Sequence, residues 1–167
     1  MSTMQETLIV LRFRDIGLRL GETIREHRRS IGQHGSCWWG WLYRDYERNP
    51  HADLDSLTSN YTEPFAIALY DTGQGLIYLA QCEQIITAET PIRSPDLELT
   101  PGYYRGRKAP AWFRLTEIAP SDDGAVIGRV CNALPSASPE CFTDLIGKRV
   151  RSLPDLRRQE VTMWVLS

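Results

Sequence analysis

The stretch Gly35-Ser36-Cys37-Trp38-Trp39-Gly40-Trp41-Leu42-Tyr43 constrains the fold most, because it holds three of the protein's five tryptophans. A strand points alternate side chains to opposite faces, so Trp39 and Trp41 share one face and Trp38 lies on the other. Neither face is polar. We therefore expect a strand covered on both faces, in a closed or helix-covered sheet and not at a wet edge. Gly40 marks a bulge, a bend or a place where another group approaches the backbone.

These tryptophans have two interpretations. Aromatic side chains contribute large buried areas, so Trp39 and Trp41 are expected first of all as core residues. Trp38 shares its face with the small residues Ser36 and Gly40. For Trp38, a core position and the wall of a ligand pocket therefore both stay open.

Length and charge limit the class of protein. A chain of 167 residues is naturally one domain, residues 1–167, and can bury a core without disulfides. The formal charge of −2 argues against coating nucleic acid by bulk electrostatics.

Of the 19 basic residues only Lys108 and Lys148 are lysines, and arginine suits bidentate phosphate contacts. The basic clusters are Arg25, Arg28 and Arg29; Arg105, Arg107 and Lys108; and Lys148, Arg149, Arg151, Arg157 and Arg158. Each fits either a salt-bridged surface or a local phosphate-binding face.

The four cysteines form no CxxC pair, which excludes a zinc ribbon and a thioredoxin-type motif. Met1–Glu6 is polar and no apolar run reaches the length of a membrane span. We therefore expect a cytoplasmic protein with free thiols, no membrane partner, and neither a metal nor a cofactor.

The hydrophobic pattern predicts about seven strands, mostly antiparallel, with a helix after the first. That helix has Leu20, Ile24, His27 and Ile31 on its apolar stripe and ends at Gly32 or Gly35. A glycine-containing turn joins the third and fourth strands into a hairpin. The expected strands are Thr7–Phe13, residues 37–43, Pro64–Tyr70, Leu76–Ile86, Ala111–Ile118, Ala125–Cys131 and Val161–Leu166.

The remaining segments are polar or rich in proline. Short helices are expected around Asp53–Thr58, Glu140–Ile146 and Ser152–Arg158, and Thr87–Pro110 is expected to be an irregular loop. A sheet of this kind removes its edges by curling. The predicted fold class is thus α+β, a small, mostly antiparallel β-barrel with a few helices packed around it.

Catalytic patterns are missing from the sequence. The three histidines His27, His34 and His51 form no recognisable triad, and no HExxH, P-loop or GxGxxG pattern occurs. Asp122-Asp123 lies in a Ser-Asp-Asp-Gly turn, where acidic residues are favoured locally. His27 is expected to be a hydrogen-bonded core histidine. Enzymatic chemistry is therefore left unsupported.

Binding of a flat ligand has better support. Stacking on aromatic planes contributes about 1–3 kcal/mol per base, and extracting a base from a duplex costs a few kcal/mol. Two or three ring contacts can thus offset base flipping. The candidate base-binding residues are Trp38, Trp39, Tyr103, Tyr104 and Trp112, and the candidate phosphate-binding residues are Arg105, Arg107 and Lys108.

The order of these features resembles the PUA-like superfamily, and within it the EVE, ASCH and YTH groups. The likeness rests on a helix followed by Gly35-Ser36-Cys37-Trp38, on the hairpin Phe65–Cys82, and on Tyr103-Tyr104 followed by the strand Ala111–Ile118. It extends from about residue 7 to residue 119. The resemblance implies an open barrel with a pocket for a modified base in DNA or RNA. Trp38 would then form one wall of an aromatic cage and Tyr103 or Tyr104 another.

The chain also departs from that pattern. Its loop has tyrosines where methyl-adenine readers typically have tryptophan, and Trp38-Trp39 is not part of their usual motif. Some ASCH-type members are hydrolases that use Lys, Thr and Glu, for which Lys108, Thr116 and Glu117 are the matching residues here. Similar segments precede effector domains in bacterial defence proteins, which would make this chain a stand-alone sensor or adaptor with an effector protein as its expected partner. The leading hypothesis is a non-enzymatic reader of a modified base; a protein-interaction adaptor and a small hydrolase are the alternatives.

Overall fold

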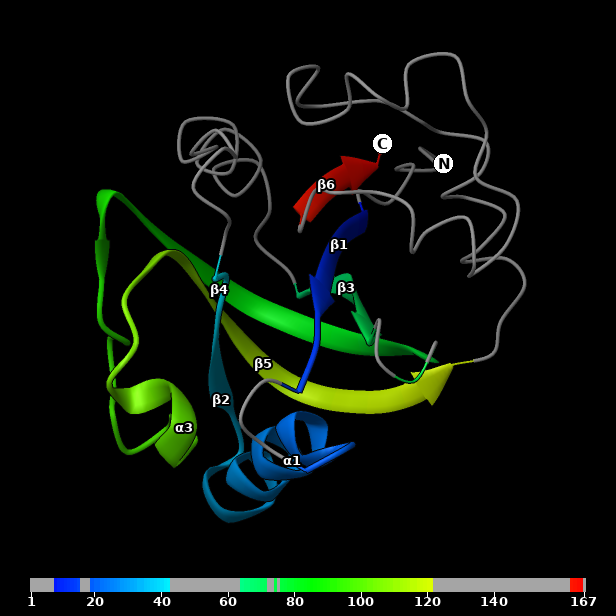
Figure 1. Cartoon of the computed structure of the whole chain (residues 1–167). Coiled ribbons are helices and arrows are strands. Elements are labelled where there is room, and N and C mark those ends of the chain that lie inside the picture. The colour runs from blue at the N-terminus through cyan, green and yellow to red at the C-terminus, as the bar shows by residue number, and fades with distance from the viewer. Residues whose placement is uncertain are drawn as a thin grey trace.

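A computed structural model describes residues 8–15, 19–42, 64–71, 74, 76–121 and 163–166. Figure 1 shows the elements in these ranges. They are β1 (Leu8–Phe13), α1 (Glu22–His34), β2 (Cys37–Gly40), β3 (Phe65–Asp71), β4 (Leu76–Ile92), α3 (Gly102–Arg105), β5 (Ala109–Ser121) and β6 (Met163–Leu166).

The six strands form one sheet in the order β2-β5-β4-β3-β1-β6. β1 and β3 pair in parallel, and the other neighbours pair antiparallel, including the predicted β3–β4 hairpin. This confirms a mainly antiparallel α+β fold. Among the described residues no pairing joins β2 to β6, so closure into a barrel stays a prediction.

Side-chain alternation divides the tryptophans of residues 38–41 between two faces, as the sequence predicts. Trp39 and Trp41 pack with Phe113 of β5 in the main core, to which α1 contributes Ile24. Trp38 packs on the other face, in a separate cluster with other aromatic residues. All four residues of β2 are buried, which confirms a strand covered on both faces.

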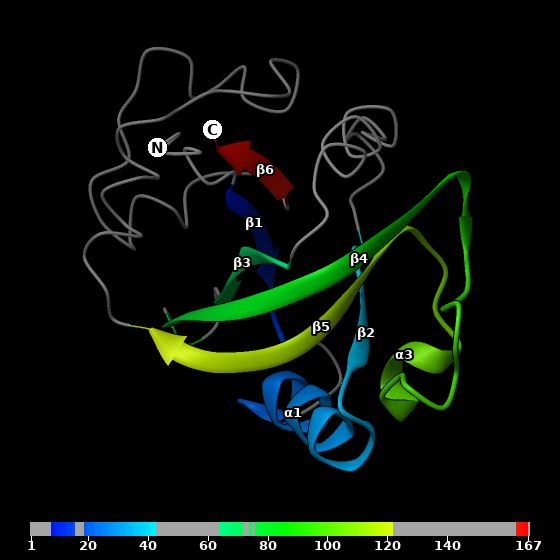
Figure 2. The same cartoon turned by 180° about the vertical axis from the view of Figure 1, so that it is seen from behind.

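The position of β2 differs from the expectation. Within the described part of the chain β2 pairs with β5 alone, so it is an edge strand of the sheet. The edge is nevertheless covered, because the Trp38 N–H donates to the Leu99 carbonyl at 2.8 Å. The sequence pattern shows that β2 is buried, but it does not distinguish a central strand from an edge covered by a loop and a short helix. Both views show α3 and α1 flanking β2 (Figures 1 and 2).

Helix α1 begins later than predicted. Asp15 accepts hydrogen bonds from the backbone N–H groups of Gly21 and Thr23, at 2.8 and 3.0 Å, and so satisfies two N–H groups at the start of the helix. Leu20 therefore precedes the helix and is 65% exposed, so its expected place on the buried stripe is wrong. The C-terminus agrees with prediction, because Gly35 adopts φ 85° and donates to the Ile31 carbonyl.

Strand β4 is longer than predicted, and the expected irregular loop Thr87–Pro110 is only partly irregular. β4 continues to Ile92 and pairs with β5, which begins at Ala109. The register of β4 against β5 shifts between Thr87 and Ile92. This irregularity accommodates Pro91, which has no backbone N–H, because not every residue of a bulge donates a hydrogen bond to the neighbouring strand. α3 then forms a single turn of helix that ends at Arg105.

Several predicted elements lie outside the described residues. They are the strand Ala125–Cys131 and the helices at Asp53–Thr58, Glu140–Ile146 and Ser152–Arg158. The predicted C-terminal strand is confirmed as β6, which pairs antiparallel with β1. None of the helices in the described ranges combines the length and apolarity needed to span a bilayer.

Candidate functional site

Aromatic side chains from three distant segments meet beside β2. Trp38 of β2, Tyr104 of α3 and Trp112 of β5 form one buried cluster with Ala109, and the half-buried Tyr103 packs against it. We call Trp38, Tyr103, Tyr104 and Trp112 the aromatic cluster. The structure thus brings together four of the five predicted base-binding residues.

The fifth residue, Trp39, lies on the opposite face of β2. It is 2% exposed and belongs to the main core. Its ring contacts Phe13 and His27, with centroids 5.1 and 4.3 Å apart. Tyr104 is the link between the two groups of rings, because its centroid lies 6.1 Å from that of Trp39.

The rings of the aromatic cluster are closely covered by protein. Trp38, Tyr104 and Trp112 are 4%, 5% and 0% exposed. The Trp112 Nε1–H donates to the Ile92 carbonyl at 2.9 Å, which fixes the indole over Gly40. A planar ligand at these rings would have to replace part of this cover, and Tyr103 is the ring most accessible from solvent.

Of the three predicted phosphate-binding residues, Arg107 contacts Tyr103 directly, and Arg105 and Lys108 lie close to it in the sequence. Arg107 donates from Nη2 to the Tyr103 hydroxyl at 2.7 Å, and its guanidinium carbon lies 5.0 Å from the ring centroid. Arg105 donates from Nε to the Thr100 carbonyl at 2.9 Å, and Lys108 is exposed. Three exposed cations thus lie within a few residues of an accessible aromatic ring, an arrangement suited to a nucleotide.

His27 is a core histidine, as predicted, and it stands beneath the aromatic rings. Its ring lies 4.3 Å from that of Trp39 and 4.8 Å from that of Tyr104. Nδ1 donates to the Thr23 carbonyl at 2.8 Å, but Nε2 has no hydrogen-bond partner among the described residues. Burial lowers the pKa of His27 to about 4, although the nearby carbonyls of Thr23 and Trp38 favour the charged ring. His27 is therefore neutral at pH 7 and contributes no positive charge.

The structure does not bring the three residues of the hydrolase alternative together. Lys108 immediately precedes β5, whereas Thr116 and Glu117 lie in its second half. Extended backbone rises roughly 3.3 Å per residue, so roughly 25 Å separates the lysine from the other two. Such a distance is too long for a shared catalytic site.

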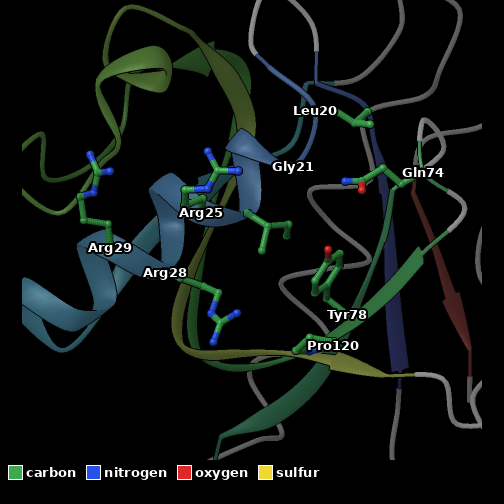
Figure 3. Close-up of a pocket in the computed structure, with 9 residues that line it drawn as sticks. Leu20, Gly21, Arg25, Arg28, Arg29, Gln74, Tyr78 and Pro120 are labelled. Carbon is green, nitrogen blue, oxygen red and sulfur yellow. The ribbon is translucent and has the colours of Figure 1, made fainter.

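A second candidate site contains Arg25, Arg28 and Arg29, the basic cluster for which the sequence left a local phosphate-binding face open. It is a pocket of about 650 Å³ between α1 and the strands β4 and β5 (Figure 3). Its lining includes Arg25, Arg28, Arg29, Gln74, Tyr78 and Pro120, and we call it the arginine pocket. The helical spacing of the arginines was visible in the sequence. The strands facing them were not, because they come from residues that are far away along the chain.

One family comparison matches most of the chain. A family model described as Pua-like matches residues 9–167. No curated protein and no solved structure matches the chain. The family match covers both the aromatic cluster and the arginine pocket.

Proposed function

The chain belongs to the Pua-like family, and on this premise we propose that it binds nucleic acid and holds a modified or flipped base at the aromatic cluster. The observation that carries the proposal is the convergence of Trp38, Tyr104 and Trp112 from three separate segments of the chain. Tyr103 packs against these rings, and the exposed Arg107 contacts Tyr103.

Access to the cluster begins at Tyr103. Its ring is half-buried, whereas Trp38, Tyr104 and Trp112 are almost fully covered. An incoming base first stacks on Tyr103 and then replaces part of the cover of the deeper rings. Arg107, which already contacts the Tyr103 ring and hydroxyl, is placed to bind the adjoining phosphate.

We also propose the domain extent, barrel closure, location and partner that the sequence leads us to expect. The module is a single domain, residues 1–167, and its sheet closes into a small barrel. It acts in the cytoplasm without a cofactor and reports to an effector protein, as in bacterial defence. The kind of base modification, and the choice between DNA and RNA, are to be read from binding data.

Titration of labelled oligonucleotides, with and without base modifications, tests the proposal. Loss of one stacked base costs about 1–3 kcal/mol, so Tyr103→Ala is expected to weaken binding about tenfold or more. Tyr103→Phe is the matched control, because it keeps the ring and removes only the hydroxyl that Arg107 contacts. Equal affinity of wild type and Tyr103→Ala for every oligonucleotide would exclude this ring from the site.

A protein-interaction adaptor is the second candidate function. Ile92, the last residue of β4, is 37% exposed, and Leu97, between β4 and α3, is 46% exposed. Exposed apolar side chains favour contacts with another protein. An adaptor would retain a protein partner at high salt and show no salt-dependent binding to nucleic acid, whereas a reader would show the reverse.

A further inference from the structure

The arginine pocket presents positive charge on one side and polar groups on the other. Arg25 and Arg28 lie three residues apart on α1, a spacing that places side chains on the same face of a helix. In Figure 3 Arg28 extends from α1 toward Tyr78 and Pro120, while the Gln74 amide lies across from Arg25. Arg29 also lines the pocket but forms an ion pair with Glu26, so Arg25 and Arg28 are the cations available to a ligand.

The acidic residues of α1 do not neutralise these two arginines. Glu26 pairs with Arg29, with an N–O distance of 3.2 Å. Glu22 accepts from a backbone N–H three residues before it, at 2.9 Å. Within the described part of the chain neither Arg25 nor Arg28 forms an ion pair. The helix therefore presents two guanidinium groups without an anionic partner in the described residues.

The two acidic residues nearest the pocket, Asp15 at the start of α1 and Asp71 at the end of β3, already accept other hydrogen bonds. Asp15 accepts from two backbone N–H groups at the start of α1, and Asp71 accepts from the Gln74 side chain at 2.9 Å. Burial, followed by the charges of Asp71 and Asp15, raises the pKa of Tyr78, and the charge of Arg28 opposes this. Tyr78 therefore stays a neutral hydroxyl at pH 7. Neither carboxylate forms an ion pair with Arg25 or Arg28 among the described residues.

We propose that Arg25 and Arg28 bind a phosphate ester in this pocket, either that of a free nucleotide or one in the backbone of a nucleic-acid strand. The fork of each guanidinium matches phosphate oxygens. A volume of about 650 Å³ is in the range of small-ligand sites, roughly 300–1,000 Å³. The Tyr78 hydroxyl offers a further polar contact, and Ile24 and Pro120 form an apolar wall for a sugar or base.

This site is separate from the aromatic cluster. Trp112 belongs to the cluster and Pro120 lines the arginine pocket, and both lie on β5. At roughly 3.3 Å per residue, roughly 25 Å of strand separates them. Phosphate binding here therefore goes beyond the proposed function and stands or fails independently of base binding.

Titrations at low salt with three probes test the proposal: pyrophosphate, adenosine monophosphate and a short labelled single-stranded oligonucleotide. Arg28→Gln is expected to weaken binding about tenfold, since one hydrogen-bonded charge contact contributes about 1.5 kcal/mol or more. Arg25→Gln combined with Arg28→Gln should weaken it further. Arg93→Gln is the matched control, because Arg93 is exposed and does not line the pocket, and it should change affinity less than about twofold.

The probes distinguish the source of the phosphate. Binding of the monophosphate that depends on Arg28 supports the proposal with a free nucleotide as ligand. Binding of the oligonucleotide alone, with its salt slope reduced by about one in Arg28→Gln, supports it with a strand as ligand. The proposal is overturned if no probe binds saturably to wild type, or if the double variant binds as wild type does. Tyr103→Ala should leave pyrophosphate binding unchanged, which separates failure of this proposal from failure of base reading.

Discussion

Gly40 is the residue at which the aromatic cluster tolerates least additional volume. A Cβ atom built on Gly40 would lie 2.8 Å from two ring carbons of Trp112. Trp112 is fully buried and hydrogen-bonded through Nε1, so its ring has little room to retreat. We expect Gly40→Ala to lower the free energy of unfolding by about 1–3 kcal/mol, measured by urea denaturation with tryptophan fluorescence.

Gly32 provides the control for this substitution. A Cβ atom there meets nothing within 4 Å, and Gly32 lies within α1. Gly32→Ala should therefore raise stability by up to about 1 kcal/mol. Unchanged stability in Gly40→Ala would show that Trp112 can shift without cost, and the packing account of this strand would be wrong.

His27 makes stability depend on pH. Its pKa in the folded protein is about 4, against 6.5 for a free histidine. Between these values the unfolded chain binds a proton that the folded protein does not, so stability decreases as the pH falls from 6.5 to 4. The free energy of unfolding decreases by about 3 kcal/mol in total once the pH is well below 4.

Denaturation curves at several pH values measure this effect. His27→Phe should lose the corresponding part of the pH dependence, although it also removes the hydrogen bond to Thr23. His34→Gln, which changes an exposed histidine on the same helix, should retain it. If the pH dependence of His27→Phe equals that of wild type, proton binding by His27 does not govern acid stability.

Residue patterns predicted the aromatic cluster better than the arginine pocket. Strand alternation separated Trp38 from Trp39 correctly, because a period of two follows directly from extended backbone. Proximity of Tyr103-Tyr104 to Trp38 came from family resemblance and not from local rules. The approach of Arg28 to Tyr78 had no local signal, because it depends on how α1 crosses the sheet.

Asp15 controls the start of α1. Its two carboxylate oxygens accept from Gly21 and Thr23, whose N–H groups would otherwise lack an intrahelical partner. Asp15→Ala should lower stability by about 0.5–2 kcal/mol, as loss of a capping side chain typically does. Asp15→Asn keeps one acceptor oxygen and is expected to lower stability less than Asp15→Ala does. Circular dichroism and urea denaturation provide the measurement, and identical curves for Asp15→Ala and wild type would contradict the capping role.

Element boundaries were predictable where a local signal marks them. Gly35 ends α1 as expected, because its left-handed conformation suits glycine. The extension of β4 to Ile92 was not predictable, since it depends on pairing with β5 across the intervening segment. Pro91 has no backbone N–H to donate, so the local sequence disfavours a strand there. In the folded sheet the register shift between Thr87 and Ile92 accommodates it.

Two buried thiols report on global opening of the sheet. Burial raises the pKa of Cys82 to about 12, and burial also raises the pKa of Cys37. Both thiols therefore stay protonated and shielded at pH 8, and alkylation by iodoacetamide should be at least about 100-fold slower than in urea. Peptide mass mapping assigns the rate to each cysteine. Rapid alkylation of Cys37 or Cys82 in the native protein would contradict the packing described here.

The α+β class and the mainly antiparallel pairing followed from the sequence, but the order of strands did not. The parallel pairing of β1 with β3 places the first strand beside a hairpin that begins more than fifty residues later. Nothing in the composition of Leu8–Phe13 selects that neighbour over β2. Long-range pairing of this kind is set by competition among all strands, which single-segment patterns do not contain.

The pairing of β6 with β1 has a consequence for synthesis of the protein. Leu8 lies opposite Leu166, so β1 leaves the ribosome long before its outer neighbour β6 is translated. During the several seconds of elongation in between, β1 is an apolar edge strand without its outer neighbour. Until residues 163–166 are translated, the unpaired edge of β1 is a template for pairing with another chain.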